Sequence, residues 1–262
     1  MAANISRRTF LAAAGTSAAA AAALTMSGCG SSDVTGSVYD ENYTFAVGTD
    51  NAPFSFTDDD GNLTGLEVSI VSAALDIAGV GYEFKEMSIE EATEAAKEGS
   101  ADGALAAIAI DDEDDELDFT SSYYDAYVAA AVNSEGKVWN LDDAKGKKVA
   151  CVSGGKAEEW VEDKKKEYNF TVEYYDTSEE AAEACTDGDA VLCVDSFPIV
   201  AYGITNDSGL IIVATEAGEY TVSYGIAVAK GTGEDLIEAF ETGIAELRES
   251  GEYDDIINEF LS

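Results

Sequence analysis

The hydrophobic and polar positions of this chain predict strands and helices in alternation. Strand-like runs are expected at residues 43–49, 81–87 and 102–110, and amphipathic helices at 65–79 and 88–100. In the first of these helices the apolar positions recur every three or four residues, and a glycine ends the pattern. Because helices connect the consecutive strands, we expect the strands to lie parallel in a sheet that helices cover.

A second series of strands and helices follows a strand-like run at residues 124–132. Its strands are expected at 146–155, 170–177, 189–196 and 210–215, and its helices at 157–168, 178–188 and 197–205. Another strand-like run at 222–231 leads to two last helices, at 233–250 and 251–260. Two series with a long strand at each junction predict an α/β fold of two lobes joined by two hinge strands. We assign residues 43–127 and 225–262 to lobe 1 and residues 128–224 to lobe 2.

The first residues are predicted to form an export signal. Arg7 and Arg8 precede Phe10, Leu11 and an Ala-rich run, which is typical of a twin-arginine signal. The apolar run is too short and too weakly apolar for a transmembrane helix. Small residues before Cys29 resemble a lipoprotein box, in which the cysteine is diacylated; each buried CH₂ then contributes roughly 0.8 kcal/mol to anchoring. The alternative is a plain secretory signal with an incidental Cys29.

Cleavage is expected to remove residues 1–28, and the small, polar residues 29–42 are expected to be a tether between membrane and domain. The protein would then lie outside the cytoplasm, anchored to the membrane by lipid. Three further cysteines, Cys151, Cys185 and Cys193, permit at most one intrachain disulfide. The simpler interpretation is that they are small buried hydrophobic residues.

The charge of the chain is strongly negative and excludes some classes of partner. The 262 residues include 53 Asp and Glu, 14 Lys and Arg and no His, which gives a net charge of −39. Nucleic-acid binding needs basic surface, and docking by charge onto anionic lipid does too. The acidic surface expected for this chain attracts cations instead. Without histidine or closely spaced cysteine pairs, no zinc or other metal site is expected.

From about residue 43 to 260, the chain resembles the polar amino-acid-binding proteins of ABC importers, the family 3 solute-binding proteins with a periplasmic-binding-protein-like type II fold. The stretches that carry this resemblance are FAVGTDNAPFSFTDDDGNLTGLEVSIVSAAL, DFTSSYYDAYVAAAV, LDDAKGKKVACVSGGKAEEW and DAVLCVDSFPIVAY, with the terminal helices. The resemblance implies a monomeric receptor without a cofactor. It would bind a small amine or amino acid between the lobes and deliver it to the permease subunits of an ABC importer.

The resemblance also implies a set of ligand-binding positions. Asp195 stands where the family holds the ligand's ammonium group, and a carboxylate suits three charged donors. Asp50 and Asn51 fall at the edge of the cleft, and Phe54 and Phe56 at its aromatic wall. The remaining positions are Ala107, Ala109, Tyr124, Gly155 and Lys156. For each aromatic residue the alternative is packing in the core or at the hinge.

The sequence departs from the family where an arginine clamps the ligand's carboxylate. The corresponding position is Glu113 or Asp114, inside an unbroken run of six acidic residues at 111–116. Arg248 lies in the terminal helix and is not expected to replace that arginine. Lys156 is either a point-charge donor to an anion or a solvated lysine at a helix start. The missing clamp shifts the expected ligand from ordinary amino acids towards amines and cations, which aromatic rings also attract.

Two other functions are compatible with the same fold. A sensor would present the ligand to a membrane partner without transporting it, and the sequence does not separate this function from transport. A dehydratase-like enzyme needs an acid or base group and an anchor for its acidic substrate. The absence of histidine and of a cleft arginine disfavours the enzyme, so we expect a binding protein.

Overall fold

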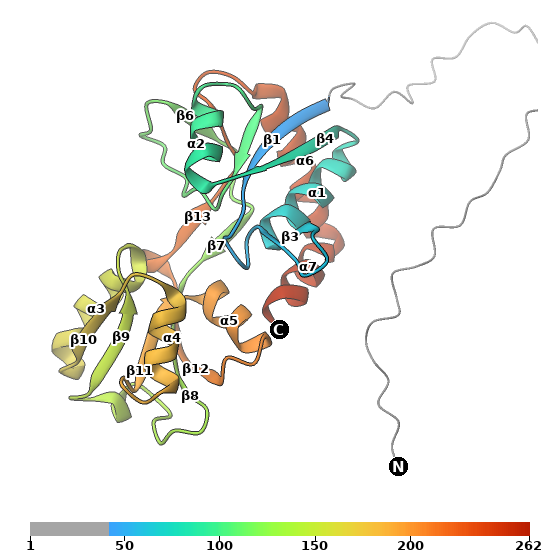
Figure 1. Ribbon diagram of the computed structural model, residues 1–262. Helices are drawn as coiled ribbons and strands as arrows, with labels where there is room; N and C mark the ends of the chain where they lie inside the picture. Colours follow the sequence, from blue (N-terminus) through green and yellow to red (C-terminus); the bar gives the residue numbers. More distant parts are fainter. Residues whose placement is uncertain (1–41) are drawn as a thin grey trace, which may run out of the picture. The chain divides into compact units, whose positions relative to one another are not determined.

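The computed structural model describes residues 42–262 (Figure 1). The predicted export signal, the tether and Cys29 lie outside the described residues. Within the described part, two five-stranded sheets carry the fold. None of the helices between residues 42 and 262 combines the length and the apolar character needed to cross a membrane.

The first sheet has the strand order β4-β1-β5-β14-β6. Its strands are β1 (Asn42–Gly48), β4 (Gly81–Met87), β5 (Gly103–Leu105), β6 (Leu117–Phe119) and β14 (Ala227–Ala229). β1 pairs in parallel with β4 and β5, and β14 is antiparallel to both of its neighbours. The helices of this lobe are α1 (Leu66–Ala78), α2 (Ile89–Lys97), α6 (Glu234–Ser250) and α7 (Glu252–Leu261).

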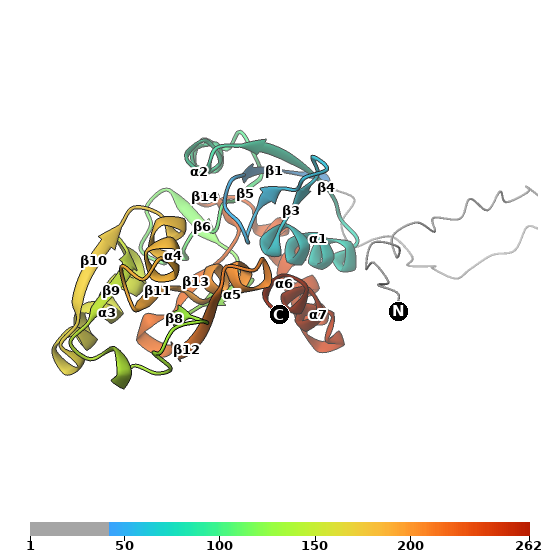
Figure 2. The same cartoon turned by 60° about the horizontal axis from the view of Figure 1, so that its bottom comes forward.

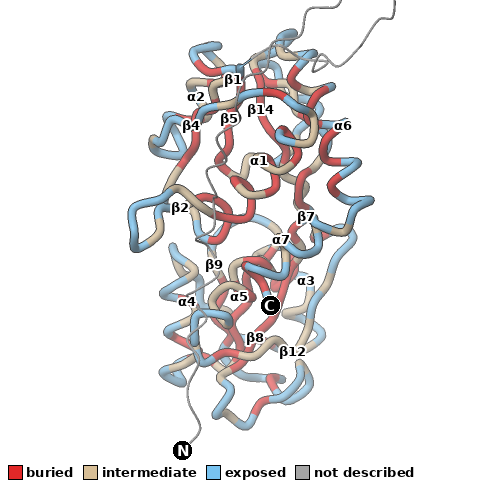
Figure 3. Tube along the Cα trace, turned by 90° about the vertical axis from the view of Figure 1, so that its right-hand side faces the viewer, coloured by how far each residue is buried: buried red, intermediate tan, exposed pale blue. Residues whose placement is uncertain are grey.

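The second sheet has the order β10-β9-β11-β8-β12. Its strands are β8 (Val128–Asn133), β9 (Lys148–Val152), β10 (Thr171–Tyr175), β11 (Leu192–Ser196) and β12 (Leu210–Glu216). The helices α3 (Gly155–Tyr168), α4 (Ser178–Thr186) and α5 (Phe197–Thr205) flank it. α3 packs on one face, where Trp160 contacts the cluster of Cys151 and Val149, while α4 and α5 pack on the other face around Cys193. Buried residues fill nearly all of β8 (Figure 3).

Two short strands, β7 (Tyr124–Ala126) and β13 (Val222–Tyr224), pair antiparallel where the chain passes between the two sheets. The remaining short elements are the hairpin β2 (Phe56–Thr57) with β3 (Leu63–Thr64) and the 3₁₀ turns η1 (Asp142–Ala144) and η2 (Gly218–Tyr220). The predicted single strands at 124–132 and 222–231 are each broken in two, because the pairing partner changes at the crossing. The predicted fold of two sheet-and-helix lobes joined by two hinge strands is confirmed, whereas the exact lobe limits stay a prediction.

The helices α1 and α6 lie side by side in both views of the molecule (Figures 1 and 2). Gly243 makes this approach possible, because a Cβ at that position would lie 1.9 Å from the carbonyl oxygen of Ala74. Phe240 and Ile244, on the same face of α6, are buried in the core that this contact closes.

Gly243→Ala is therefore expected to push α1 and α6 apart and to lower the free energy of unfolding by about 2 kcal/mol, as overpacking does. This loss should exceed the gain of up to about 1 kcal/mol that alanine brings to a helix. Urea unfolding measures the difference. The matched control is Gly203→Ala in α5, where a Cβ would meet Ser208 at an ordinary 3.6 Å. Equal stability of the two variants would contradict the explanation.

Candidate functional site

Asp195 is a buried carboxylate near the C-terminal end of β11. Its side chain is 6% exposed, and its Oδ1 accepts a hydrogen bond of 2.6 Å from the Ser196 N–H. Burial raises the pKa of Asp195, and hydrogen bonds from Ser178 and Ser196 oppose that rise. None of the ion pairs formed within residues 42–262 includes Asp195. A ligand's ammonium group would supply the opposite charge that this buried acid lacks.

The side chain of Asp195 lines a cavity of about 350 Å³ between α4 and α5. Ala52, from the loop after β1, also lines it, so residues from both sheet regions meet there. Cys193 and Leu210 belong to its apolar part, and within the described residues no lysine or arginine contributes to the wall. The cavity therefore suits a ligand that is cationic at one end and apolar elsewhere.

The predicted aromatic positions divide into two groups. Phe54, 2% exposed, packs edge-on against Tyr124 and Tyr224, with ring centroids 6.2 Å and 5.1 Å away. Tyr124 and Tyr224 are register partners in the β7–β13 ladder, so these three rings pack at the hinge. Phe56 instead lies 5.6 Å from Tyr202, a residue of α5 that lines the cavity. Of the two predicted wall residues, Phe56 is the one that contacts the cavity lining.

Asp50 and Asn51 lie in a tight loop directly after β1. Asp50 is exposed and adopts a left-handed conformation with φ of 68°. The carbonyl of Asn51 accepts hydrogen bonds from the N–H groups of Phe54 and Ser55 at 2.7 and 3.2 Å. This loop presents Ala52 to the cavity, while neither Asp50 nor Asn51 lines it.

Glu67 is a buried acid that is not among the predicted site positions but contacts one of them, Ala107. It is fully buried in α1, and its Oε1 accepts a 2.6 Å hydrogen bond from the Tyr123 hydroxyl. Burial raises the pKa of Glu67 to about 7, while hydrogen bonds from Tyr123, Ala107, Ser55 and Ala106 counteract part of the rise. An acid beside Leu66 and Val68, on the buried side of an apolar helix, is the signal that could have identified it.

The predicted positions Ala107 and Ala109 follow β5. The Ala107 N–H lies 3.2 and 3.3 Å from the two carboxylate oxygens of Glu67, and Ala107 itself has a positive φ of 47°. Glu67 thus holds the backbone in a left-handed turn that is unusual for a residue other than glycine. Ala109 is exposed and forms an isolated β-bridge with Tyr224 at the hinge.

Lys156 and Gly155 stand at the start of α3, where the sequence allowed an anion site. Lys156 Nζ lies 2.7 Å from Glu159 Oε2, and the Gly154 N–H donates to Glu158 Oε2 at 2.6 Å. The helix start and its lysine are thus already paired with acids of the same helix. This arrangement favours the solvated helix-start interpretation of Lys156 over a role as carboxylate donor.

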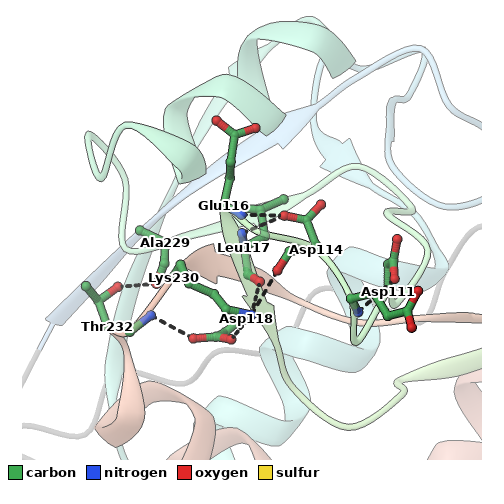
Figure 4. Close-up of polar contacts among 10 residues, drawn as sticks. Asp111, Asp114, Glu116, Leu117, Asp118, Ala229, Lys230 and Thr232 are labelled. Atoms are coloured by element: carbon green, nitrogen blue, oxygen red, sulfur yellow. Dashed lines mark hydrogen bonds and ion pairs between the residues drawn. The ribbon is translucent and has the colours of Figure 1, made fainter.

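The acidic run at 111–116 forms an ordered surface loop beside β6 and β14 (Figure 4). Asp114 Oδ1 accepts hydrogen bonds from the Glu116 and Leu117 N–H groups at 2.7 and 2.8 Å, and these bonds lower the pKa of Asp114. Lys230 Nζ donates to the Asp114 carbonyl at 2.9 Å. Asp114, one of the two residues expected at the position of the family's arginine, therefore stabilises its own loop, and nothing in this run offers a positive charge to a carboxylate.

Comparison with known proteins agrees with this architecture. The family model described as bacterial extracellular solute-binding proteins, family 3, matches residues 43–262. The L-cystine-binding protein TcyJ of Escherichia coli K12 is 31% identical, with 80% of each chain covered. The L-arginine-binding protein of Pseudomonas aeruginosa is 30% identical, with 80% of this chain and 84% of that protein covered. The open structure of substrate-binding domain 2 of Lactococcus lactis GlnP superposes with a TM-score of 0.77 at 28% identity, covering 84% of this chain and 95% of that one.

Proposed function

The chain belongs to the bacterial extracellular solute-binding proteins of family 3, and from that premise we propose that it binds a small amine or cationic amino acid at Asp195. Its relatives are amino-acid-binding receptors of ABC transporters rather than enzymes. Substrate binding and delivery to an ABC importer therefore follow from the family. The class of ligand and the attachment to the membrane are the parts that we add.

The observation that carries the ligand class is the buried carboxylate of Asp195 without a basic partner. An ammonium group that replaces water around this acid would form a charge-assisted hydrogen bond in a region of low dielectric. The position of the family's arginine holds an acid instead, so a ligand carboxylate meets no guanidinium there. A cationic ligand also agrees with the arginine that one of the relatives binds.

A thermal-shift screen of amines, amino acids and short peptides tests this proposal. A true ligand at 100 times its Kd should stabilise the protein by about 2.7 kcal/mol. Amines and cationic amino acids should raise the melting temperature, and glutamate should not. Selective stabilisation by glutamate would overturn the ligand class, although the protein would remain a solute receptor. Uptake of the ligand by cells with and without the protein separates a transport receptor from a sensor.

Cys29 is proposed as the point of lipid attachment, on the basis of the small residues that precede it. Cys29→Ser should release the protein from the membrane fraction, because diacylation supplies the anchor. Fractionation followed by immunoblotting measures the distribution. Cys185→Ser is the control, since this buried cysteine lies in α4 and its variant should stay with the membrane. A Cys29→Ser protein that remains in the membrane fraction would rule out the lipid anchor.

A further inference from the structure

The cavity next to Asp195 extends well beyond the space that one ammonium group needs. It follows the groove between α4 and α5, from Asp195 to Ser208 and Leu210. Asp195 is the register partner of Ala129, whereas Leu210 is the partner of Asn133. Ala129 and Asn133 are four residues apart along β8, so Asp195 and Leu210 are separated by roughly 13 Å in the direction of this strand. The groove is therefore elongated.

The middle of the groove is apolar, and two small residues leave the space between the helices open there. Ala182 of α4 and Gly203 of α5 both line the groove, together with Cys193 and Val200. A Cβ on Gly203 would touch nothing within 4 Å except Ser208. The sheet closes the bottom of this space, where Cys193 and Leu210 are buried. The middle of the groove thus suits a methylene chain.

The two ends of the groove are polar. Ser178, which hydrogen-bonds Asp195, marks the first end, and Thr186, one residue beyond Cys185 in α4, marks the second. At the second end lies the buried hydroxyl of Ser208, for which no hydrogen-bond partner exists among residues 42–262. Unpartnered buried hydroxyls are uncommon because they cost free energy, so this hydroxyl can pair with a polar group of a ligand. Glu183, an exposed acid one turn before Thr186, adds negative charge to the same part of the wall.

We propose that the α4–α5 groove is a binding compartment for linear aliphatic amines, and for diamines above all. One ammonium group binds Asp195, the methylene chain lies between Ala182 and Gly203, and the second ammonium group reaches Ser208 and Glu183. This inference rests on the proposed function, since it uses the same carboxylate for the first ammonium group. It adds a preference for chain length and for a second positive charge at the far end.

Titration calorimetry with propylamine, heptylamine, 1,3-diaminopropane and 1,7-diaminoheptane tests the compartment. Each methylene that enters the groove should strengthen binding about fourfold, so heptylamine should bind far better than propylamine. The diamine 1,7-diaminoheptane should bind better still, whereas 1,3-diaminopropane is too short to span the groove. Affinity that is independent of chain length would overturn the proposal.

Two variants that fill the groove make the test specific. Ala182→Leu should weaken heptylamine and 1,7-diaminoheptane at least about tenfold by occupying the space of several methylene groups, and should change propylamine less than about twofold. Gly203→Leu fills the groove from the opposite helix and serves if Ala182→Leu does not fold. Unchanged binding of the long amines by either folded variant would contradict the proposal.

The charge at the far end is tested separately. Glu183→Gln should weaken 1,7-diaminoheptane by about threefold, as expected for a pair at the solvent boundary, and should leave heptylamine unchanged. Glu180→Gln is the matched control, because Glu180 also lies on α4 but does not line the groove. Equal effects of the two variants would refute the role of Glu183.

The results also separate this inference from the proposed function. If propylamine or a cationic amino acid binds in an Asp195-dependent manner, but neither chain length nor Ala182→Leu matters, the groove proposal fails and the proposed function stands. If no amine or amino acid binds the folded protein, both fail.

Discussion

Asp195→Ala is expected to weaken binding of an amine ligand at least roughly 30-fold. Truncating one partner of a buried, hydrogen-bonded charge pair typically costs about 2–5 kcal/mol, and 2 kcal/mol corresponds to roughly 30-fold in Kd. The effect should be this large because Asp195 is 6% exposed, so water cannot replace the lost carboxylate around the ammonium group. Calorimetry with heptylamine or with the best amine from the thermal-shift screen measures it.

The matched control is Asp189→Ala. Asp189 is an exposed acid three residues before β11, and it does not line the cavity between α4 and α5. Its removal changes the net charge by the same amount, so a general electrostatic effect would weaken binding equally in both variants. A loss smaller than threefold for Asp195→Ala, with an amine that binds the unmodified protein, would refute the assignment of Asp195.

Glu67 is expected to make stability fall as the pH rises from about 4.5 to 7. Its pKa is raised by burial from 4.5 to about 7 in the folded protein. In this window the unfolded chain loses the proton of Glu67 while the folded protein keeps it, so ionisation favours unfolding. The stabilisation is fully present below pH 4.5 and is lost above pH 7, and 2.5 pH units correspond to about 3 kcal/mol.

Glu67→Gln isolates this contribution, because glutamine does not titrate. Between pH 4.5 and 7.5 the free energy of unfolding of the unmodified protein should fall by about 3 kcal/mol relative to that of the variant. Urea unfolding at several pH values measures both. The comparison uses the slope against pH, so a constant loss of stability in the variant does not affect it. Parallel pH profiles would show that Glu67 ionises in the folded state as it does in water.

Tyr123→Phe offers a second check on the same group. The Tyr123 hydroxyl donates to Glu67 Oε1 and so favours the ionised carboxylate. Its removal should raise the pKa of Glu67 further and move the pH dependence to higher pH. A shift to lower pH would contradict the arrangement of donors around Glu67.

Local periodicity located most strands and helices of both lobes, but it missed the edge strand β6 and the short hairpin of β2 and β3. It failed at Tyr127, where the predicted strand at 124–132 breaks, because residue patterns do not report which strand a segment pairs with. The backbone N–H of Phe197 donates to the Tyr127 carbonyl at this point, at 2.6 Å, a contact between residues far apart in the sequence. Pairing across such distances is a property of the tertiary structure.

The candidate site was predictable in part. The sequence pointed to Asp195, and the structure describes it as a buried acid lining a cavity. The role of Glu67 was hidden, because its three-dimensional neighbours Tyr123 and Ala107 lie about 40 or more residues away. The groove could not be read from the sequence either, since Ala182 and Gly203 look like ordinary helix residues until two helices face each other.

The position of β14 has a consequence for the order in which the chain can fold. β14 (Ala227–Ala229) lies between β5 and β6 in the first sheet. A nascent chain that ends before residue 227 therefore carries the edge strand β6 without its sheet neighbour β14, while all strands of the second sheet, from Val128 to Glu216, have already been synthesised. Lobe 2, with the second sheet, can assemble during synthesis. Lobe 1 can complete its sheet only after β14, in the last part of the chain, has been synthesised. Unpaired strand edges promote aggregation. A chaperone would therefore protect the chain most before residue 227 emerges from the ribosome.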